Sequence, residues 1–472
     1  MIKAYFYIIV LLPVFAFAQT ADRNSDGQGK STLAMAYKRT NNTNDSSKAS
    51  RPSSGGIDAF PNLPADDTFD DFKVVNKASR KTSAINPKSE LRYSNANAEL
   101  TFSDFDAAMS DLNRVIRKNP KFADAYIKRG NAKNGIGDNL GAIEDFTKAI
   151  QLDPNDYIAY NDRGYTRVII QDYKSAITDF DRALQLNANY AKPFYNRGIA
   201  KAKTQDYNGA IDDFTQALTI SPGHVVIYKN IGDARAGLKD YEGAIAEYNK
   251  ALTLSRGYAD AYCGRGKAKQ ELKDYKGALA DFDLALALNP KHSVAYYNKA
   301  VTQATLEDYD NSITNLNKAI ELDPEFSDAY FNRALIKNKM NETKGAVADY
   351  TSVIELNPEN VDAHLLRGVA NMDLEHFDSA IEDFAKVTAL SPENAYAFYF
   401  KGISENNQHS YSDALADFDQ AIVLNPQYAE AYNGRGEANY HKKNKKEACA
   451  DWNKAFELGY AAAMDNINQY CK

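Results

Sequence analysis

The chain has 472 residues, of which 25% are charged and 44% hydrophobic, a composition that is ordinary for a soluble globular protein. The formal net charge is −7 and no basic stripe dominates, which argues against a general nucleic-acid-binding protein. The six His residues show no metal-ligand spacing and the three Cys residues include no C-x-x-C pair, so we expect no metal site and no cofactor.

The segment Met1–Ala18 has the features of a secretory signal peptide. Lys3 supplies a positive charge, residues 4–17 form an apolar run, and Ala16-Phe17-Ala18 is a small-x-small sequence suited to cleavage. An uncleaved membrane anchor is the less favoured alternative, because the run is shorter than the roughly 20 residues that a spanning helix needs. We therefore expect cleavage near Ala18 and a periplasmic or secreted mature chain without an integral membrane segment.

Residues 19–88 differ in composition from everything that follows. They are rich in Ser, Asn, Thr, Asp and Lys and lack a sustained apolar period, which predicts a disordered polar linker. Seven Lys and four Arg against eight Asp give this linker a charge of 11 − 8 = +3. The piece Phe60–Phe72 mixes aromatic and acidic residues, and we interpret it as a sticky spot in the linker, with docking on a partner or on the protein's own groove as the alternative.

From Ser89 onward the sequence repeats with a fixed period of 34, the interval from Ser89 to Ala123, and the span 89–462 divides into eleven units without insertion or deletion. A fixed period of this length is typical of a solenoid in which each unit packs on its neighbours. Residues 463–472 are amphipathic and predict a short capping helix at the C-terminal end. The units begin at Ser89, Ala123, Tyr157, Ala191, Val225, Ala259, Ser293, Ser327, Val361, Ala395 and Ala429.

The unit that begins at Ala259 illustrates the pattern. Tyr262 at position 4 and Gly266 at position 8 share one face of a first helix, because they are four residues apart. Ala278 and Phe282 share a face of a second helix for the same reason. Asp274 is suited to the N-cap of the second helix.

This arrangement of aromatic, small and Ala positions within one unit resembles the tetratricopeptide repeat. The resemblance implies an all-α fold, a right-handed superhelical solenoid of tandem helix–turn–helix repeats, and a role in binding proteins or peptides on the concave face. Signal peptide, linker, repeats and cap account for every residue, so no catalytic domain is expected and we predict that the protein is not an enzyme.

In this family the concave face is formed mainly by positions 2, 5, 9, 12 and 13 of the first helices. A known clamp for a C-terminal carboxylate is missing, because Lys229 is the only Lys at position 5 and its neighbours do not match. Position 9 is usually polar in the family, but positions 5 and 9 are both apolar in four successive units here. The resemblance thus predicts a peptide-binding groove formed by Tyr297, Val301, Phe331, Leu335, Leu365, Val369, Tyr399 and Ile403. The alternative, of equal weight, is that these side chains only pack between adjacent first helices.

Together these features predict an exported scaffold that binds a protein or peptide partner and no nucleic acid. The alternative is a glycan- or envelope-polymer-binding module that uses aromatic and Asn residues of the groove as stacking platforms.

The Cys residues predict one disulfide at the C-terminal end. Cys449 lies in the second helix of the last unit and Cys471 in the capping helix, and antiparallel helices about a turn at Gly459 would bring both to the same level. Export would place them in a compartment that permits disulfides. Two separately buried thiols are the alternative, and we expect Cys263 to stay outside the bridge as a thiol.

Overall fold

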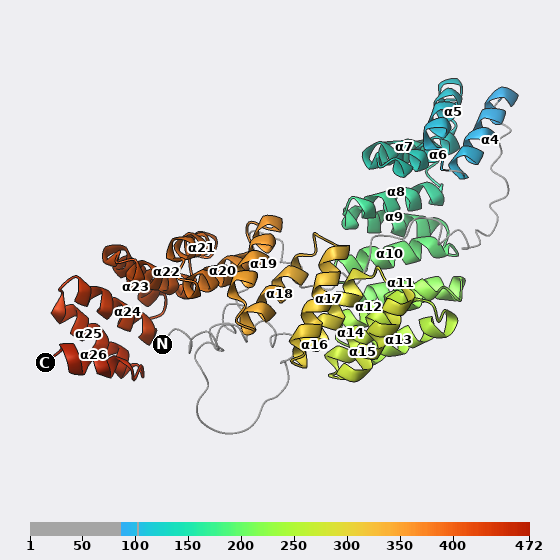
Figure 1. Cartoon of the computed structure of the whole chain (residues 1–472). Coiled ribbons are helices and arrows are strands. Elements are labelled where there is room, and N and C mark those ends of the chain that lie inside the picture. The colour runs from blue at the N-terminus through green and yellow to red at the C-terminus, as the bar shows by residue number, and fades with distance from the viewer. Residues whose placement is uncertain (1–85, 102) are drawn as a thin grey trace. The chain divides into compact units, whose positions relative to one another are not determined.

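The computed structural model describes residues 86–101 and 103–472 (Figure 1). The predicted signal peptide, residues 19–85 of the predicted linker and the piece Phe60–Phe72 lie outside the described residues. All regular structure within the described ranges is helical, in consecutive antiparallel pairs, which confirms the all-α solenoid expected from the sequence.

The described chain divides at Pro290 into two compact units, which we call the N-terminal body (residues 86–290) and the C-terminal body (residues 291–472). In each helix pair the first helix has an even label and the second an odd label. The N-terminal body contains α4 (Pro87–Thr101), α5 (Phe105–Lys118), α6 (Ala123–Gly135), α7 (Asn139–Leu152), α8 (Tyr157–Ile169), α9 (Tyr173–Leu186), α10 (Ala191–Lys203), α11 (Tyr207–Ile220), α12 (Val225–Gly237), α13 (Tyr241–Leu254), α14 (Ala259–Glu271) and α15 (Tyr275–Leu288).

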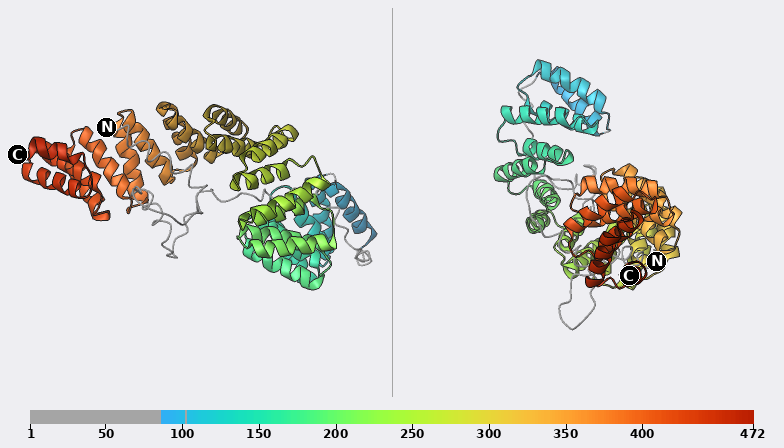
Figure 2. Two further views of the ribbon diagram at one scale, coloured as in Figure 1. Left: turned by 90° about the horizontal axis from the view of Figure 1, so that it is seen from below. Right: turned by 90° about the vertical axis from the view of Figure 1, so that its left-hand side faces the viewer.

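The C-terminal body continues the same alternation of first and second helices (Figure 2). It contains α16 (Ser293–Thr305), α17 (Tyr309–Leu322), α18 (Ser327–Lys339), α19 (Thr343–Leu356), α20 (Val361–Asp373), α21 (Phe377–Leu390), α22 (Ala395–Asn407), α23 (Tyr411–Leu424), α24 (Ala429–His441), α25 (Lys445–Glu457) and α26 (Ala463–Tyr470).

Small residues at position 8 allow the two helices of a unit to approach closely. A Cβ atom on Gly266 would lie only 2.7 Å from the ring of Phe282, which is fully buried in the second helix of the same unit. Gly at this position is therefore required by packing, because a side chain there would occupy the volume of the aromatic ring. This is the contact that the sequence pattern predicts for the unit.

A tight turn with a left-handed residue joins the two helices of each unit. Lys273 at position 15 has φ of 64°, and Asp274 follows it as N-cap, accepting a hydrogen bond from the backbone N–H of Gly277 at 2.9 Å. The N-cap predicted at Asp274 is thus confirmed. Position 15 also has positive φ at Ser103, Gly137, Gln171, Gln205, Lys239, Glu307, Asn341, Glu375, His409 and Lys443.

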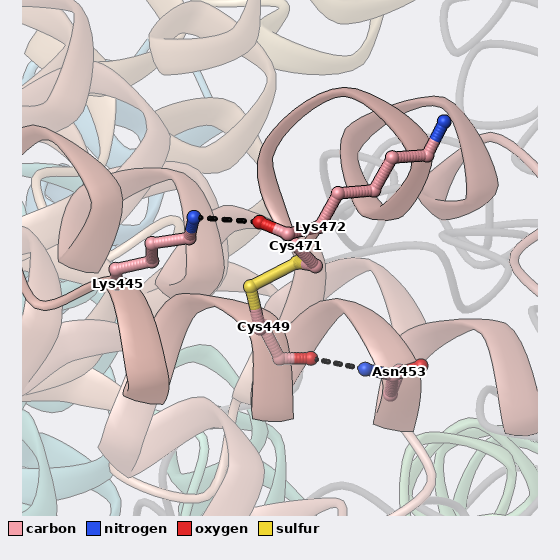
Figure 3. Close-up of a disulfide and its surroundings, with 5 residues drawn as sticks. All are labelled: Lys445, Cys449, Asn453, Cys471 and Lys472. Atoms are coloured by element: carbon pink, nitrogen blue, oxygen red, sulfur yellow. Dashed lines mark hydrogen bonds between the residues drawn. A yellow bond between two sulfur atoms is a disulfide. The ribbon is translucent and has the colours of Figure 1, made fainter.

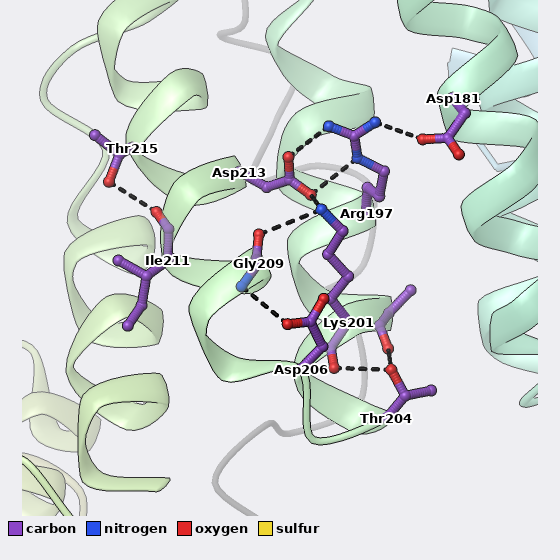
Figure 4. Close-up of polar contacts among 10 residues, drawn as sticks. Asp181, Arg197, Lys201, Thr204, Asp206, Gly209, Ile211, Asp213 and Thr215 are labelled. Carbon is purple, nitrogen blue, oxygen red and sulfur yellow. Dashed lines mark hydrogen bonds and ion pairs between the residues drawn. The ribbon is translucent and has the colours of Figure 1, made fainter. Parts of the chain in front are cut away.

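A buried ion pair also joins the two helices of most units. Arg197 Nη2 and Nε donate to the two carboxylate oxygens of Asp213 at 2.6 and 2.9 Å (Figure 4). Arg197 Nη1 reaches Asp181 of the preceding unit, and Lys201 Nζ lies 2.8 Å from Asp213. The Arg therefore connects helices within a unit and between units. The same pair recurs as Arg129–Asp145, Arg163–Asp179, Arg265–Asp281, Arg333–Asp349, Arg367–Asp383 and Arg435–Asp451.

At the C-terminal end α26 folds back against α25 (Figure 3). The Sγ atoms of Cys449 and Cys471 are 2.07 Å apart and their Cα atoms 5.6 Å apart, within the range of a disulfide. Lys445 Nζ donates to the backbone oxygen of Lys472 at 3.1 Å across the same two segments. Cys263 is buried in α14 and takes no part in this pair.

Consecutive first helices also contact one another, for example α16 with α18, α20 with α22, and α22 with α24. Second helices of neighbouring units do not approach each other as closely. The first helices therefore lie on the inner side of each body, where corresponding positions of successive units come together. Among the described residues no helix has both the length and the apolar character needed to cross a membrane.

Candidate functional site

The candidate site is one face of the first helices α18, α20, α22 and α24. On α20 the residues Asp362, Leu365, Val369, Met372 and Asp373 recur at intervals of three and four (the last two adjacent), which places them on one side of the helix. We call this side, taken over four units, the inner face. It consists of Asp328, Phe331, Leu335, Asn338, Lys339, Asp362, Leu365, Val369, Met372, Asp373, Tyr396, Tyr399, Ile403, Asn406, Asn407, Glu430, Asn433, Glu437, Tyr440 and His441.

Three of the eight predicted groove residues are buried in the packing between repeats. Leu335 is 3% exposed, and Val369 and Tyr399 are each 8% exposed. The Tyr399 ring lies 5.2 Å from that of Phe400 and 4.9 Å from that of Tyr428, measured between centroids. These three side chains thus pack within the protein, as in the alternative stated above.

The other five predicted groove residues, Tyr297, Val301, Phe331, Leu365 and Ile403, are half-buried. Tyr297 Oη accepts a hydrogen bond from Asn332 Nδ2 of the next first helix at 3.1 Å. The ring of Phe331 packs edge-on against that of Tyr350, with centroids 5.8 Å apart. The structure thus places six of the eight residues on the inner face, where they form an apolar floor, and the other two, Tyr297 and Val301, on the preceding first helix α16. The role of all eight in binding stays a prediction.

Acidic side chains that we did not single out from the sequence border this floor. Burial raises the pKa of Asp373 to about 6, and it also raises the pKa of Glu437, which accepts a hydrogen bond from Asn433 Nδ2 at 2.8 Å. Asp362 has an exposed side chain, yet desolvation by the surrounding protein raises the pKa of its carboxyl group as well. In the described chain neither Asp362 nor Asp373 forms an ion pair.

Two amide oxygens on the inner face also lack hydrogen-bond donors within the described structure. Asn338 is 3% exposed, and its Nδ2 donates to Tyr350 Oη at 3.2 Å while its Oδ1 has no donor. Asn406, at the same position two units later, is half-buried and has an Oδ1 without a donor. A buried acceptor without a donor is unfavourable, so both oxygens would gain from a donor supplied by another molecule.

In one unit of the N-terminal body, that of α12, a buried ion pair closes positions 5 and 9. Lys229 Nζ lies 2.6 Å from an oxygen of Asp233, and the two residues are 6% and 3% exposed. Tyr248 Oη donates to the other oxygen of Asp233 at 2.7 Å. Because the pair is satisfied internally and buried, it offers less to a partner than the inner face of the C-terminal body does.

A metal centre finds no support in the described part of the chain, where no three His, Cys, Asp or Glu side chains converge in a way that could hold an ion.

Comparison with protein families matches most of the chain to a single kind of repeat. The family described as "Tetratricopeptide repeat" matches residues 93–156, 339–395 and 401–466, and also residues 157–190, 191–224 and 259–292. A family described as "TPR repeat" matches residues 232–273 and 304–341. Comparison with curated protein sequences gives no match.

Solved structures with similar folds are known. The chain is 26% identical to YrrB, whose structure is described as a TPR protein with an unusual peptide-binding site, over 39% of this chain and 95% of that chain, with a TM-score of 0.37. It is 16% identical to yeast Tom70 over 80% of this chain and 93% of that chain, with a TM-score of 0.36. It is 20% identical to Pseudomonas aeruginosa PilF over 43% of this chain and 92% of that chain, with a TM-score of 0.38. At these scores the similarity carries no argument about function.

Proposed function

Because the chain belongs to the tetratricopeptide repeat family, we propose that it is an exported scaffold that binds a protein or peptide partner along the inner face of its C-terminal body. The main support is that α16 contacts α18, α20 contacts α22 and α22 contacts α24, which brings the same positions of neighbouring units onto one face. A linear partner would cross several units and contact each of them in turn.

The burial of Tyr399 and the half-burial of Phe331 favour a peptide over a glycan as partner. A glycan-binding module would need aromatic rings with an open face for stacking. Tyr399 is buried among other rings, and Phe331 is half-buried with its ring edge-on to that of Tyr350. The acceptors that border the apolar floor fit the backbone N–H groups and cationic side chains of a peptide.

Export is supported by the predicted signal peptide and by the position of two Cys residues. The Cα atoms of Cys449 and Cys471 are 5.6 Å apart, a separation that suits a disulfide. Such bonds persist in oxidising compartments and are rare in the cytosol. We therefore include the Cys449–Cys471 disulfide and a periplasmic or secreted location in the proposal.

Site-specific photo-crosslinking in the native host tests this function. The crosslinking amino acid replaces Asp362 or Asn407 on the inner face, or Glu355 or Glu382 on the second helices, all of which are exposed. We expect one protein to be captured from both inner positions and from neither outer position, as identified by mass spectrometry. The same protein captured equally from the outer positions would contradict inner-face binding, and adducts with an insoluble envelope polymer would favour the glycan alternative.

A further inference from the structure

The charged side chains of the inner face are mostly carboxylates, whereas its Asn, Tyr and His side chains can both donate and accept hydrogen bonds. Its charged groups at neutral pH are five carboxylates and one ammonium group, that of Lys339. The Lys339 ammonium group already lies 3.7 Å from Glu307 and 4.9 Å from the centre of the Tyr309 ring, both in the preceding unit. The carboxylates belong to Asp328, Asp362, Asp373, Glu430 and Glu437.

The side-chain amide of Asn338 is buried on the same face, and its lack of a hydrogen-bond donor does not depend on the acidic residues. Asn338 stands two helical turns after Phe331, so both lie on the same side of α18. Its Oδ1 has no donor although the residue is 3% exposed. Asn406 repeats the arrangement two turns after Tyr399 on α22. Both oxygens lack a donor in the described chain, as does Oδ1 of Asn134 at the same position of α6.

We propose that the inner face binds an extended basic segment of a partner protein, whose Lys or Arg side chains pair with the carboxylates while apolar side chains rest on the floor between them. This inference rests on the proposed function and adds the chemistry of the partner. Cationic donors suit the five carboxylates and the amide oxygens of the face, because Lys and Arg supply several donors and no acceptor. A cationic partner would also favour the ionised forms of Asp362 and Asp373, whose pKa is raised by desolvation.

The spacing of the acceptors sets the length of the segment. Packed helices lie roughly 8–10 Å apart, so α18 to α24 extend over about 30 Å. An extended chain covers about 3.3 Å per residue, so a segment of about 10 residues would reach all four helices. Lys or Arg at every third or fourth position would meet the carboxylates of α18, α20 and α24, and would lie beside the amide groups of Asn406 and Asn407 on α22.

The test uses the full chain and three fluorescein-labelled peptides of about 10 residues, long enough to cross the four helices. In the first peptide Lys, Ser and Leu alternate, and in the other two Gln or Glu replaces Lys. Fluorescence anisotropy measures the binding of each peptide at low and at high salt. We expect the Lys peptide to bind most tightly and to lose affinity with salt, since ion pairs at a solvated face are screened.

A charge-matched pair of variants locates the interaction. Asp362→Asn, Asp373→Asn and Glu437→Gln combined should weaken binding of the Lys peptide by about tenfold or more, because three part-desolvated ion pairs are lost. Glu355→Gln, Glu382→Gln and Asp413→Asn combined remove the same charge from exposed sites on second helices, and should change affinity by less than about twofold. Circular dichroism verifies that both variants keep their helices.

The outcomes separate this inference from the proposed function. Equal binding of the Gln or Glu peptide would overturn the basic partner and leave a peptide-binding face intact. Equal loss of binding in both variants would place the site elsewhere and overturn the inference. Binding that appears only after removal of residues 19–85 would mean that the chain's own linker fills the face. Binding of none of the three peptides, together with crosslinks from no inner position, would overturn both proposals.

Discussion

At the scale of single residues, one position of the first helix decides how the buried carboxylate of the second helix is neutralised. These are positions 11 and 23 of the unit, which are Lys337 and Asp349 in the unit that begins at Ser327. In five of the eleven units a Lys or Arg at position 11 adds to the Arg at position 7, as Lys337 does 2.8 Å from Asp349. In the unit that begins at Ala395, position 11 is Glu405, so two carboxylates share the ammonium group of Lys401. Glu405 is 5% exposed and its Oε2 has no hydrogen-bond partner in the described structure.

This exception predicts a pH-dependent stability that Glu405→Gln should remove. Burial, together with Asp417, raises the pKa of Glu405 to about 8, above its usual value of 4.5. The folded protein therefore holds this proton more tightly than the unfolded chain does, and the stability contribution present below pH 4.5 is lost as the pH rises to 8. The free energy of unfolding should fall by up to about 1.4 kcal/mol per pH unit over this range.

Urea unfolding followed by circular dichroism between pH 5 and 8 measures the effect. Glu405→Gln should flatten the dependence of the midpoint on pH and raise the midpoint at pH 8. Glu393→Gln, at an exposed loop position, is the matched control and should leave the profile unchanged. If Glu405→Gln keeps the native dependence of the urea midpoint on pH, Glu405 is ionised in the folded state and does not cause that dependence.

At the scale of elements, the two bodies differ in how their second helices begin. In the N-terminal body each second helix has an Asp N-cap whose side chain accepts a backbone hydrogen bond, at Asp104, Asp138, Asp172, Asp206, Asp240 and Asp274. In the C-terminal body the corresponding residues make no such bond, at Asp308, Glu342, His376, Ser410 and Asn444. The Asp308 side chain accepts no backbone hydrogen bond, because both its oxygens accept from Asn311 Nδ2, at 3.0 and 2.9 Å.

We predict that Glu342→Asp stabilises the C-terminal body by about 1 kcal/mol, because it restores an N-cap without a change of charge. Gly345 occupies the position of Gly277, whose N–H donates to the Asp274 cap at 2.9 Å, and has no side chain that could compete. The reverse change, Asp274→Glu, should destabilise the N-terminal body by a similar amount. Thermal unfolding and hydrogen exchange of α19 and α15 measure both effects, and an unchanged exchange rate in α19 would show that the cap does not form.

The helices and their closest contacts could be predicted from the sequence, but the burial of the groove residues could not. Spacing of three and four residues identifies the faces that carry Gly266, Phe282 and the cap at Asp274, because these are local features. The same spacing places Leu335 on a face without revealing that α19 and α20 cover it. The left-handed backbone conformation of the turn could not be predicted either, because residues such as Lys273 occupy a position that favours Gly.

At the scale of the whole molecule, the sequence period continues through Pro290 although the structure divides there into two bodies. A strict repeat contains no signal for this division, because each unit keeps the same pattern of core positions on both sides. In such an array each unit is stabilised by its neighbours, so the terminal units depend on fewer contacts. The last unit compensates with α26, whose Ala463 is buried with Trp452 in a terminal cluster.

We predict that the Cys449–Cys471 disulfide stabilises the C-terminal unit and its capping helix α26, and no other part of the molecule. The two residues are 22 positions apart, and closing a loop of this size stabilises a fold by about 3 kcal/mol in the chain-entropy account. Cys449→Ser should therefore increase hydrogen exchange in α24, α25 and α26 and leave the N-terminal body unchanged, since coupling along a repeat array decays from neighbour to neighbour.

Thiol counting on the unfolded, unreduced protein purified from the exported fraction decides whether the bond forms. One reactive thiol, that of Cys263, is expected for the native chain, and two are expected for Cys449→Ser. Cys263→Ser is the control: it should leave no reactive thiol and the same exchange protection of α26 as in the native protein. Three thiols in the native chain would refute the disulfide, and protection of α26 would then come from packing of Trp452 and Tyr470, whose ring centroids lie 5.7 Å apart.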